Sequence, residues 1–416
     1  MKKRSLFLVW LPALLLICPS IFAQTPSWPR WRGPNGDGIS GETAWNPEGL
    51  KGGAKVAWKV DIGFGFSDVV IQDGRLYTMG LAKGKWTFHC LDAKNGKRFW
   101  QRTLDSTQDP WSTPCVEADR VYGLSKDGTL VCLRTSNGKL IWKKSLKEDF
   151  GIPMPSYGWA SSPIVEGPML LLSAGKAGLA LDKMTGALVW ASSRGYEVSS
   201  GYGYYATPVV CDFEGKRCGL FFGELYFSAV DLATGKQVWT CGHHLTHPMN
   251  DPMVSGTRIF VASPETRLLE MAQGAPRTIW TNANFSGPNP VLIDGFVYGS
   301  HTGFLSFPSL AWDQYEAAAI PVRCVEFTTG KVMWDSPEKI PFVSICASAK
   351  KLILLDVHGT LRIVEASPAV YREISCADVL GGANRPRRFM VPPVLCGGRI
   401  YCRNYAGDLV CIDVRQ

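Results

Sequence analysis

Side chains that could bind a ligand gather at three places in this sequence, and the largest group is aromatic. Its members stand just before segments that begin with small polar residues and proline, and they are Trp111, Tyr157, Trp159, Tyr202, Tyr204 and Tyr205. Aromatic rings gathered in this way offer a surface that suits a peptide, a sugar or a flat ligand. The simpler interpretation is a set of loop rings that pack over one end of the fold, because apolar rims also serve packing.

Two shorter clusters carry histidine and arginine. His243 and His247 share one short segment and could supply two metal ligands, but a metal site needs three or four groups that converge. No second ligand pair with suitable spacing accompanies them, which favours a polar loop. Arg385, Arg387 and Arg388 could receive a carboxylate or a sulfate. A solvated loop is again the simpler interpretation.

Catalytic motifs are not evident in the sequence, and the cysteines have two interpretations. We find no Gly-x-Ser-x-Gly elbow, phosphate loop or dinucleotide fingerprint in a strand-to-helix setting. Four cysteines occupy matching points of a repeated pattern, where a small buried apolar residue is the favoured interpretation; they are Cys90, Cys132, Cys324 and Cys411. Cys211 and Cys218 flank an expected hairpin tip and could pair if the strand register places them opposite each other.

The elements that must position these side chains are revealed by a repeated phrase, in which a turn glycine is followed a few residues later by tryptophan. The tryptophans that end the copies are Trp100, Trp142, Trp190, Trp239, Trp280 and Trp334. Successive copies lie 42, 48, 49, 41 and 54 residues apart. A period of about 40–50 residues with a turn glycine and an aromatic residue in each unit predicts a β-propeller.

One unit, residues 112–142, shows the expected blade. Four short runs rich in β-branched and aromatic residues are separated by turns at residues 118–120, 126–128 and 136–139. Four short antiparallel strands make one propeller blade. Each tryptophan is expected to pack between neighbouring blades, where a buried indole contributes a few kcal/mol.

The ends of the chain predict how the ring closes. The last unit runs to Val414 and stops one strand short, whereas the strand around Trp58 has no blade before it. Pairing the two would leave no sheet edge exposed. We expect an all-β fold of eight blades, with Ile374 replacing the eighth tryptophan, or seven blades if one degenerate unit is an insertion. Residues 24–54 would form an N-terminal segment and residues 55–416 a single, monomeric propeller domain.

Residues 1–23 have the layout of a secretory signal, with a basic start, an apolar run from Leu6 to Ile17 and Ala23 before a plausible cleavage point. The run is shorter than the ~20 apolar residues of a membrane span. Cys18 raises a lipoprotein alternative, which bulky Ile17 disfavours. Removing these residues lowers the formal charge from +8 to near +5, a scattered excess that does not indicate nucleic-acid binding. We expect an exported protein of the periplasm, the cell envelope or the extracellular space.

The Gly-Lys-x-x-Trp units and the opening segment 28–38 resemble the pyrroloquinoline-quinone-type propeller repeat over residues 28–414. This repeat is shared by quinoprotein dehydrogenases and outer-membrane protein assembly factor B. The resemblance implies a binding or scaffolding module for a protein or peptide partner in envelope assembly. Quinoprotein dehydrogenases of this fold carry adjacent cysteines and a calcium-binding carboxylate set, whereas this sequence has no Cys-Cys pair. We therefore expect no cofactor, and keep a quinoprotein-like oxidoreductase, or another enzyme acting at the channel mouth, as the alternative.

Overall fold

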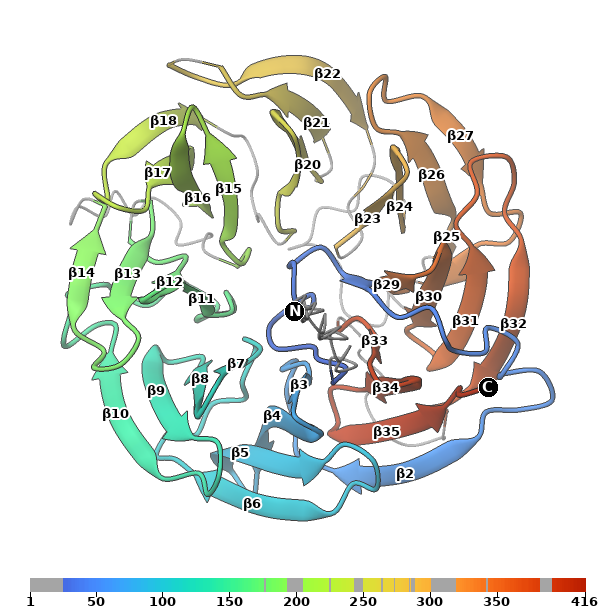
Figure 1. Ribbon diagram of the computed structural model, residues 1–416, viewed down its shortest axis with the longest axis horizontal. Coiled ribbons are helices and arrows are strands. Elements are labelled where there is room, and N and C mark those ends of the chain that lie inside the picture. Colours follow the sequence, from blue (N-terminus) through green and yellow to red (C-terminus); the bar gives the residue numbers. More distant parts are fainter. Residues whose placement is uncertain are drawn as a thin grey trace, which may run out of the picture.

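The computed structural model describes residues 25–175, 177–192, 205–223, 226–242, 250–262, 265–272, 274–283, 285, 289–300, 319–341, 343–381 and 391–416. Within these residues the fold is a ring of eight antiparallel sheets about a central axis (Figure 1). Each sheet is one blade of four strands, and one blade gains a fifth strand. The eight-blade prediction is confirmed, and the seven-blade alternative is excluded. No helix of the described residues is long and apolar enough to cross a membrane.

The first four blades follow the chain without interruption. Blade 1 contains β3 (Val70–Gln72), β4 (Arg75–Ala82), β5 (Lys85–Asp92) and β6 (Arg98–Thr103). Blade 2 contains β7 (Cys115–Glu117), β8 (Arg120–Leu124), β9 (Thr129–Arg134) and β10 (Leu140–Ser145). Blade 3 contains β11 (Ile164–Glu166), β12 (Met169–Leu172), β13 (Leu179–Asp182) and β14 (Leu188–Ala191). Blade 4 contains β15 (Val209–Phe213), β16 (Lys216–Phe222), β17 (Tyr226–Asp231) and β18 (Gln237–Gly242).

The other four blades complete the ring. Blade 5 contains β19 (Met253–Ser255), β20 (Arg258–Val261), β21 (Glu265–Glu270) and β22 (Arg277–Ala283). Blade 6 contains β23 (Val291–Ile293), β24 (Phe296–Ser300), β26 (Val322–Glu326) and β27 (Val332–Asp335), beside a ribbon of β25 (Ala319–Ile320) and β28 (Ile340–Pro341). Blade 7 contains β1 (Ile39–Ser40), β29 (Val343–Ser348), β30 (Lys351–Asp356), β31 (Thr360–Glu365) and β32 (Glu373–Asp378). Blade 8 contains β2 (Val56–Asp61), β33 (Val394–Leu395), β34 (Arg399–Arg403) and β35 (Asp408–Asp413).

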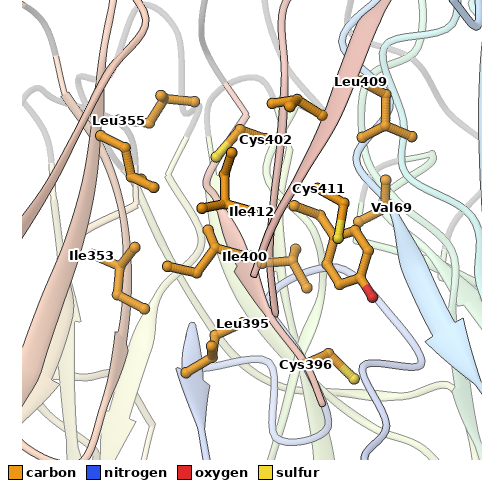
Figure 2. Close-up of a cluster of buried hydrophobic side chains, with 14 of the residues drawn as sticks. Val69, Ile353, Leu355, Leu395, Cys396, Ile400, Cys402, Leu409, Cys411 and Ile412 are labelled. Atoms are coloured by element: carbon orange, nitrogen blue, oxygen red, sulfur yellow. The ribbon is translucent and has the colours of Figure 1, made fainter. Parts of the chain in front are cut away.

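Blade 8 closes the ring with strands from both ends of the chain. β2 pairs antiparallel with β35, and Trp58 stands opposite Cys411, as predicted. Figure 2 shows the seam beside this blade, where side chains of β30, β34 and β35 meet Val69 at the start of blade 1. These side chains are buried, so the joint between the two ends is part of the hydrophobic core.

Neighbouring blades are held together by a tryptophan that packs on a glycine. The ring of Trp100 in blade 1 lies over Gly138 of blade 2, so close that a Cβ on this glycine would sit 2.6 Å from the indole. The indole N–H donates to Thr135 O at 2.8 Å. Four other pairs repeat the packing; they are Trp58 with Gly96, Trp142 with Gly186, Trp190 with Gly235 and Trp280 with Gly330. Within one copy, the glycine therefore packs against the tryptophan of the preceding blade, while the tryptophan packs on the glycine of the following blade.

Three interfaces depart from this pattern. At the first, Trp334 of blade 6 donates its indole N–H to Ser367 O of blade 7 at 2.8 Å and packs on Tyr371 rather than on a glycine. At the second, Gly274 of the looser copy has nothing within 4 Å of the place a Cβ would occupy, so Trp239 does not pack on it, and the buried indole N–H of Trp239 has no hydrogen-bond partner within the described residues.

At the third interface, the register of blade 7 places Ser375, not Ile374, opposite Ile363, at the position that tryptophan holds in the other blades. The assignment of Ile374 was wrong by one residue. The bulge at this point occurs in all eight outer strands, but here no tryptophan marks which residue follows it. In blade 8 the turn that would receive this side chain is absent, because β35 and β2 come from opposite ends of the chain. Ser375 Oγ instead donates to Pro47 O, in the segment before β2, at 2.5 Å.

The cysteines behave as small core residues. Cys90 lies opposite Trp100, and the equivalent place in blades 3 and 4 is held by Ala180 and Ala229. Burial raises the pKa of the Cys90 thiol to about 11. Cys211 and Cys218 are register partners on β15 and β16, as the hairpin prediction required, and both thiols are free.

The packing of indole on glycine predicts a large effect of one methyl group. Gly138→Ala should lower the free energy of unfolding by about 3 kcal/mol, because the added Cβ overlaps Trp100 and the residue has a φ of 69°. Gly84→Ala is the matched control, since Gly84 has a φ of 71° and open space around it. Its free energy of unfolding should fall by only about 1 kcal/mol, which is the cost of placing alanine in a left-handed backbone conformation. Urea unfolding measures both values, and equal losses would contradict the proposed contact.

Candidate functional site

Four aromatic residues form a continuous cluster at the end of the ring that carries the connections between blades. We call this end the connection face, and the cluster, made of Phe64, Phe66, Trp111 and Tyr405, the aromatic ridge. The ring of Phe66 lies 4.7 Å from that of Tyr405 and 5.9 Å from that of Trp111, between centroids. Phe64 lies 5.9 Å from Tyr405 and is 45% exposed. The ridge spans the connections of blades 8, 1 and 2.

A cation and a carboxylate flank the ridge at Trp111. Lys126 Nζ lies 3.9 Å from the centroid of the Trp111 ring, a cation–π contact. Asp109 accepts the indole N–H at 2.7 Å and lies 3.6 Å from Lys126 Nζ. The indole is therefore fixed in orientation, while the lysine adds positive charge beside an apolar surface.

The backbone beneath the ridge is held by buried Arg403 of β34. Its guanidinium donates to the carbonyls of Gly63 and Gly65 at 3.3 and 3.0 Å, on either side of Phe64. It also donates to Met79 O at 3.0 Å. Arg403 is a positioning residue, because it ties the loop that carries Phe64 and Phe66 to blades 8 and 1.

The structure separates the aromatic residues that the sequence grouped together. Trp111 belongs to the ridge, whereas Tyr157 is 43% exposed and lies on the connection between blades 2 and 3. A backbone hydrogen bond from Trp159 N–H to Lys126 O fixes this connection nearby. Trp159 is 1% exposed and packs in the core against Gly128 and Leu146, so its side chain offers no surface to a ligand. Tyr205 is half-buried at the entry to blade 4.

The remaining candidates lie outside the described residues. They are Tyr202, Tyr204, His243, His247, Arg385, Arg387 and Arg388. Their roles stay predictions. Sequence reasoning missed Phe64, Phe66 and Tyr405, and the signal that was present is the alternation of glycine and phenylalanine over residues 63–66 before the first blade.

A chain of hydrogen bonds encircles the central channel from blade 1 to blade 6. In each step the backbone N–H of one blade's entry residue donates to the side-chain oxygen of the next. The distances are 2.9, 2.9, 3.2, 2.7 and 3.3 Å, and the residues, which we call the girdle, are Asp68, Thr113, Ser162, Thr207, Asp251 and Asn289. All six are buried. Proline follows five of them and favours the extended conformation of the residue before it.

The N-terminal segment 28–40, which we call the strap, fills part of this channel. Trp28 exchanges backbone hydrogen bonds with Ile71 of blade 1, and Pro29 O accepts from Val116 of blade 2. β1 then pairs in parallel with β29 of blade 7. In Figure 1 this segment lies near the axis and runs outward across blade 7 towards β2.

The strap is anchored at the girdle by a polar contact in the channel. Trp31 Nε1 donates to Asp251 Oδ2 at 2.7 Å, and buried Arg32 donates to Pro290 O at 2.7 Å. Burial raises the pKa of Asp251 to about 6, against the opposing charge of Arg32. Asp251 therefore joins the strap and two blades at one carboxyl group.

The described residues contain no group of three or more His, Cys, Asp or Glu side chains placed to hold a metal ion. What the geometry offers instead is recognition. The connection face carries an aromatic ridge in which Phe64 is exposed and the other three rings are half-buried, on a backbone that buried hydrogen bonds hold in place. Such a surface suits an extended peptide with apolar side chains.

The fold defines a repeat β-propeller of eight four-stranded blades, and comparison with known proteins gives the family. The family model for the outer membrane protein assembly factor BamB matches residues 88–336 and 228–416, and the chain belongs to this family. The outer membrane protein assembly factor BamB of Yersinia pestis is 24% identical over 234 residues, which cover 53% of this chain and 56% of that protein. The match thus spans little more than half the length of the curated relative.

Solved structures share the fold across most of the chain. BamB from Moraxella catarrhalis superposes with a TM-score of 0.61 at 16% identity, covering 86% of this chain and 97% of that one. A quinohemoprotein alcohol dehydrogenase from Comamonas testosteroni superposes with a TM-score of 0.68 at 14% identity, covering 94% and 81%. At these identities the likeness shows the propeller and does not decide between binding and oxidation.

Asp68 of the girdle predicts a pH dependence of stability. Burial raises its pKa from an ordinary value of 3.8 to about 8. Between these values the folded protein holds a proton that the unfolded chain has released, so the free energy of unfolding falls as the pH rises. Asp68→Asn removes this titration. The free energy of unfolding of this variant should therefore fall less between pH 5 and pH 8.5 than that of the wild type. Exposed Asp105→Asn is the control, and parallel curves for all three proteins in urea unfolding would contradict the assignment.

Proposed function

We propose that this chain is an exported, non-catalytic propeller that binds unfolded segments of proteins destined for the outer membrane. The observation that carries the proposal is the aromatic ridge, because Phe64 is 45% exposed although the chain has an extensive core in which to bury it. Membership of the BamB family supports the assignment to outer-membrane protein assembly. The site of action would then be the periplasm or the inner surface of the envelope.

The ridge suits an unfolded client for physical reasons. Its rings provide apolar contact without demanding one sequence, and the ion pair of Lys126 with Asp109 holds the Trp111 ring in place beside them. Because Arg403 holds the loop from below, little ordering of this protein is required on binding, which preserves affinity. A client in extended form can lie across the connections of three blades.

Substitution of the exposed aromatic residue of the ridge tests the proposal. Phe64→Ser should weaken binding of a urea-unfolded outer-membrane barrel protein about ten-fold, because an exposed aromatic anchor contributes on the order of 1–2 kcal/mol to an interface. Fluorescence anisotropy of the labelled client, measured after dilution from urea, gives the dissociation constant.

Phe99→Ser is the matched control for this measurement. Phe99 is 49% exposed, but it lies on β6 at the outer side of blade 1, under Arg75. Its exchange should leave client binding unchanged. Equal weakening by both variants, or none by Phe64→Ser, would remove the ridge from the proposal.

The quinoprotein alternative is tested against the residues present. The sequence has no adjacent cysteines, and the described residues provide no metal-binding group of three carboxylates, histidines or cysteines. These residues do not fit a quinone held with Ca²⁺, so we propose no step through one. Protein incubated with pyrroloquinoline quinone and Ca²⁺ should retain no chromophore after desalting and should not support dye-linked alcohol oxidation. A retained chromophore with turnover would favour the oxidoreductase.

A further inference from the structure

A pocket of about 330 Å³ opens beside the strap, against the inner strands of blades 3 and 4. Its volume is at the lower limit of the sites that enclose small ligands or single side chains. Trp31 of the strap forms one wall, and Ile164 of β11 and Val209 and Val210 of β15 form the other. Arg30 and Arg217 also contribute to its lining. Glu166 and Asp251 line the pocket as well, the first paired with Arg217 and the second bonded to the Trp31 indole, so the lining combines apolar side chains with polar and charged groups of both signs.

The two arginines differ in their partners. Arg217 pairs with Glu166 at 2.8 Å and with Asp212 at 3.2 Å, so its charge is compensated. Arg30 has no carboxylate partner among the described residues, and its Nη2 donates to Pro34 O at 3.0 Å. A guanidinium carries five N–H donors in a planar fork that matches a carboxylate. The charge that the pocket leaves uncompensated therefore favours an anionic group.

The edge of β15 offers the pocket an open strand position. Glu214 and Gly215 have φ values of 48° and 72° and form a two-residue turn, so Phe213 and Lys216 are a hydrogen-bonded pair. Pairs alternate along the hairpin, which makes Val210 and Gly219 a non-hydrogen-bonded pair. The N–H and C=O of Val210 hence point away from β16, towards the inner edge. Among the described residues, no backbone group of another segment bonds to Val210.

The strap shows that these inner edges accept extended chain. Trp28 and Pro29 pair with the inner edges of blades 1 and 2, and Ile39 with that of blade 7. The corresponding edges of blades 3 and 4 face the pocket instead. Asp251 holds the Trp31 wall in place through the indole N–H, so the pocket is formed before any ligand enters.

We propose that this pocket binds the carboxyl terminus of an extended peptide, with the α-carboxylate on Arg30 and the last, apolar side chain between Trp31 and Val209. The residues that precede the terminus pair with the open edge of β15 at Val210. This inference rests on the proposed function, because it assigns the pocket to the free end of an unfolded client and the ridge to its interior segments.

The test uses the purified full chain and a fluorescein-labelled heptapeptide that ends in phenylalanine. The peptide with a free carboxylate should bind about ten-fold more tightly than its carboxamide, as expected for a charge-assisted hydrogen bond. Arg30→Gln should weaken the free-acid peptide about ten-fold and leave the carboxamide unchanged. Arg102→Gln, an exposed arginine on outer strand β6, is the control and should change neither affinity.

Other outcomes overturn the inference. Equal binding of acid and amide, equal weakening of both by Arg30→Gln, or no binding of either peptide would show that the pocket does not hold a carboxyl terminus. N-acetyl-phenylalanine should compete at least ten-fold more weakly than the heptapeptide, and equal competition would assign the pocket to small organic acids instead. If client binding still depends on Phe64 while the peptide shows no carboxylate dependence, the proposed function stands and this inference falls.

Discussion

The packing of a tryptophan from one blade on a glycine of the next is the contact on which the rest of the ring depends. Glycine is required because any side chain would enter the volume of the indole, as at Gly138 beneath Trp100. Since the two residues of one copy serve different interfaces, a blade that carries both is fixed to both of its neighbours. The contact is made at five of the eight interfaces, where it limits how closely the packed blades approach.

The functional surfaces follow from this closed frame. The girdle keeps the entry residues of six blades at fixed distances around the channel, and the strap is anchored to it at Asp251. The loop of Phe64 and Phe66 is held by Arg403 from the far end of the sequence. Both recognition surfaces, the ridge and the pocket, therefore lie on segments whose backbone is bonded on several sides. Binding would cost these segments little conformational entropy.

The sequence predicted the periodic part of the structure well and the rest poorly. The glycine–tryptophan period gave the blades, and the orphan strand around Trp58 gave the closure, because both are local patterns. Ile374 was misplaced by one residue because this copy has lost both the tryptophan and the turn glycine that mark the position in the other copies. The ridge escaped prediction because Phe66 and Tyr405 meet only through the closed ring. Trp159 was misassigned since sequence does not show whether a loop aromatic points into the core or away from it.

The strap also constrains how the chain can fold. Residues 28–40 bond to blade 7, and Glu42 accepts hydrogen bonds from Gly397 and Gly398 in blade 8, more than 350 positions away. These contacts join residues that lie far apart in the sequence, so they raise the contact order and slow the search for the native state. The strap is synthesised before all eight blades are complete and is thus among the last segments to reach its final partners. Until then the seam between blades 8 and 1 exposes apolar surface, and the growing chain itself would benefit from chaperone protection.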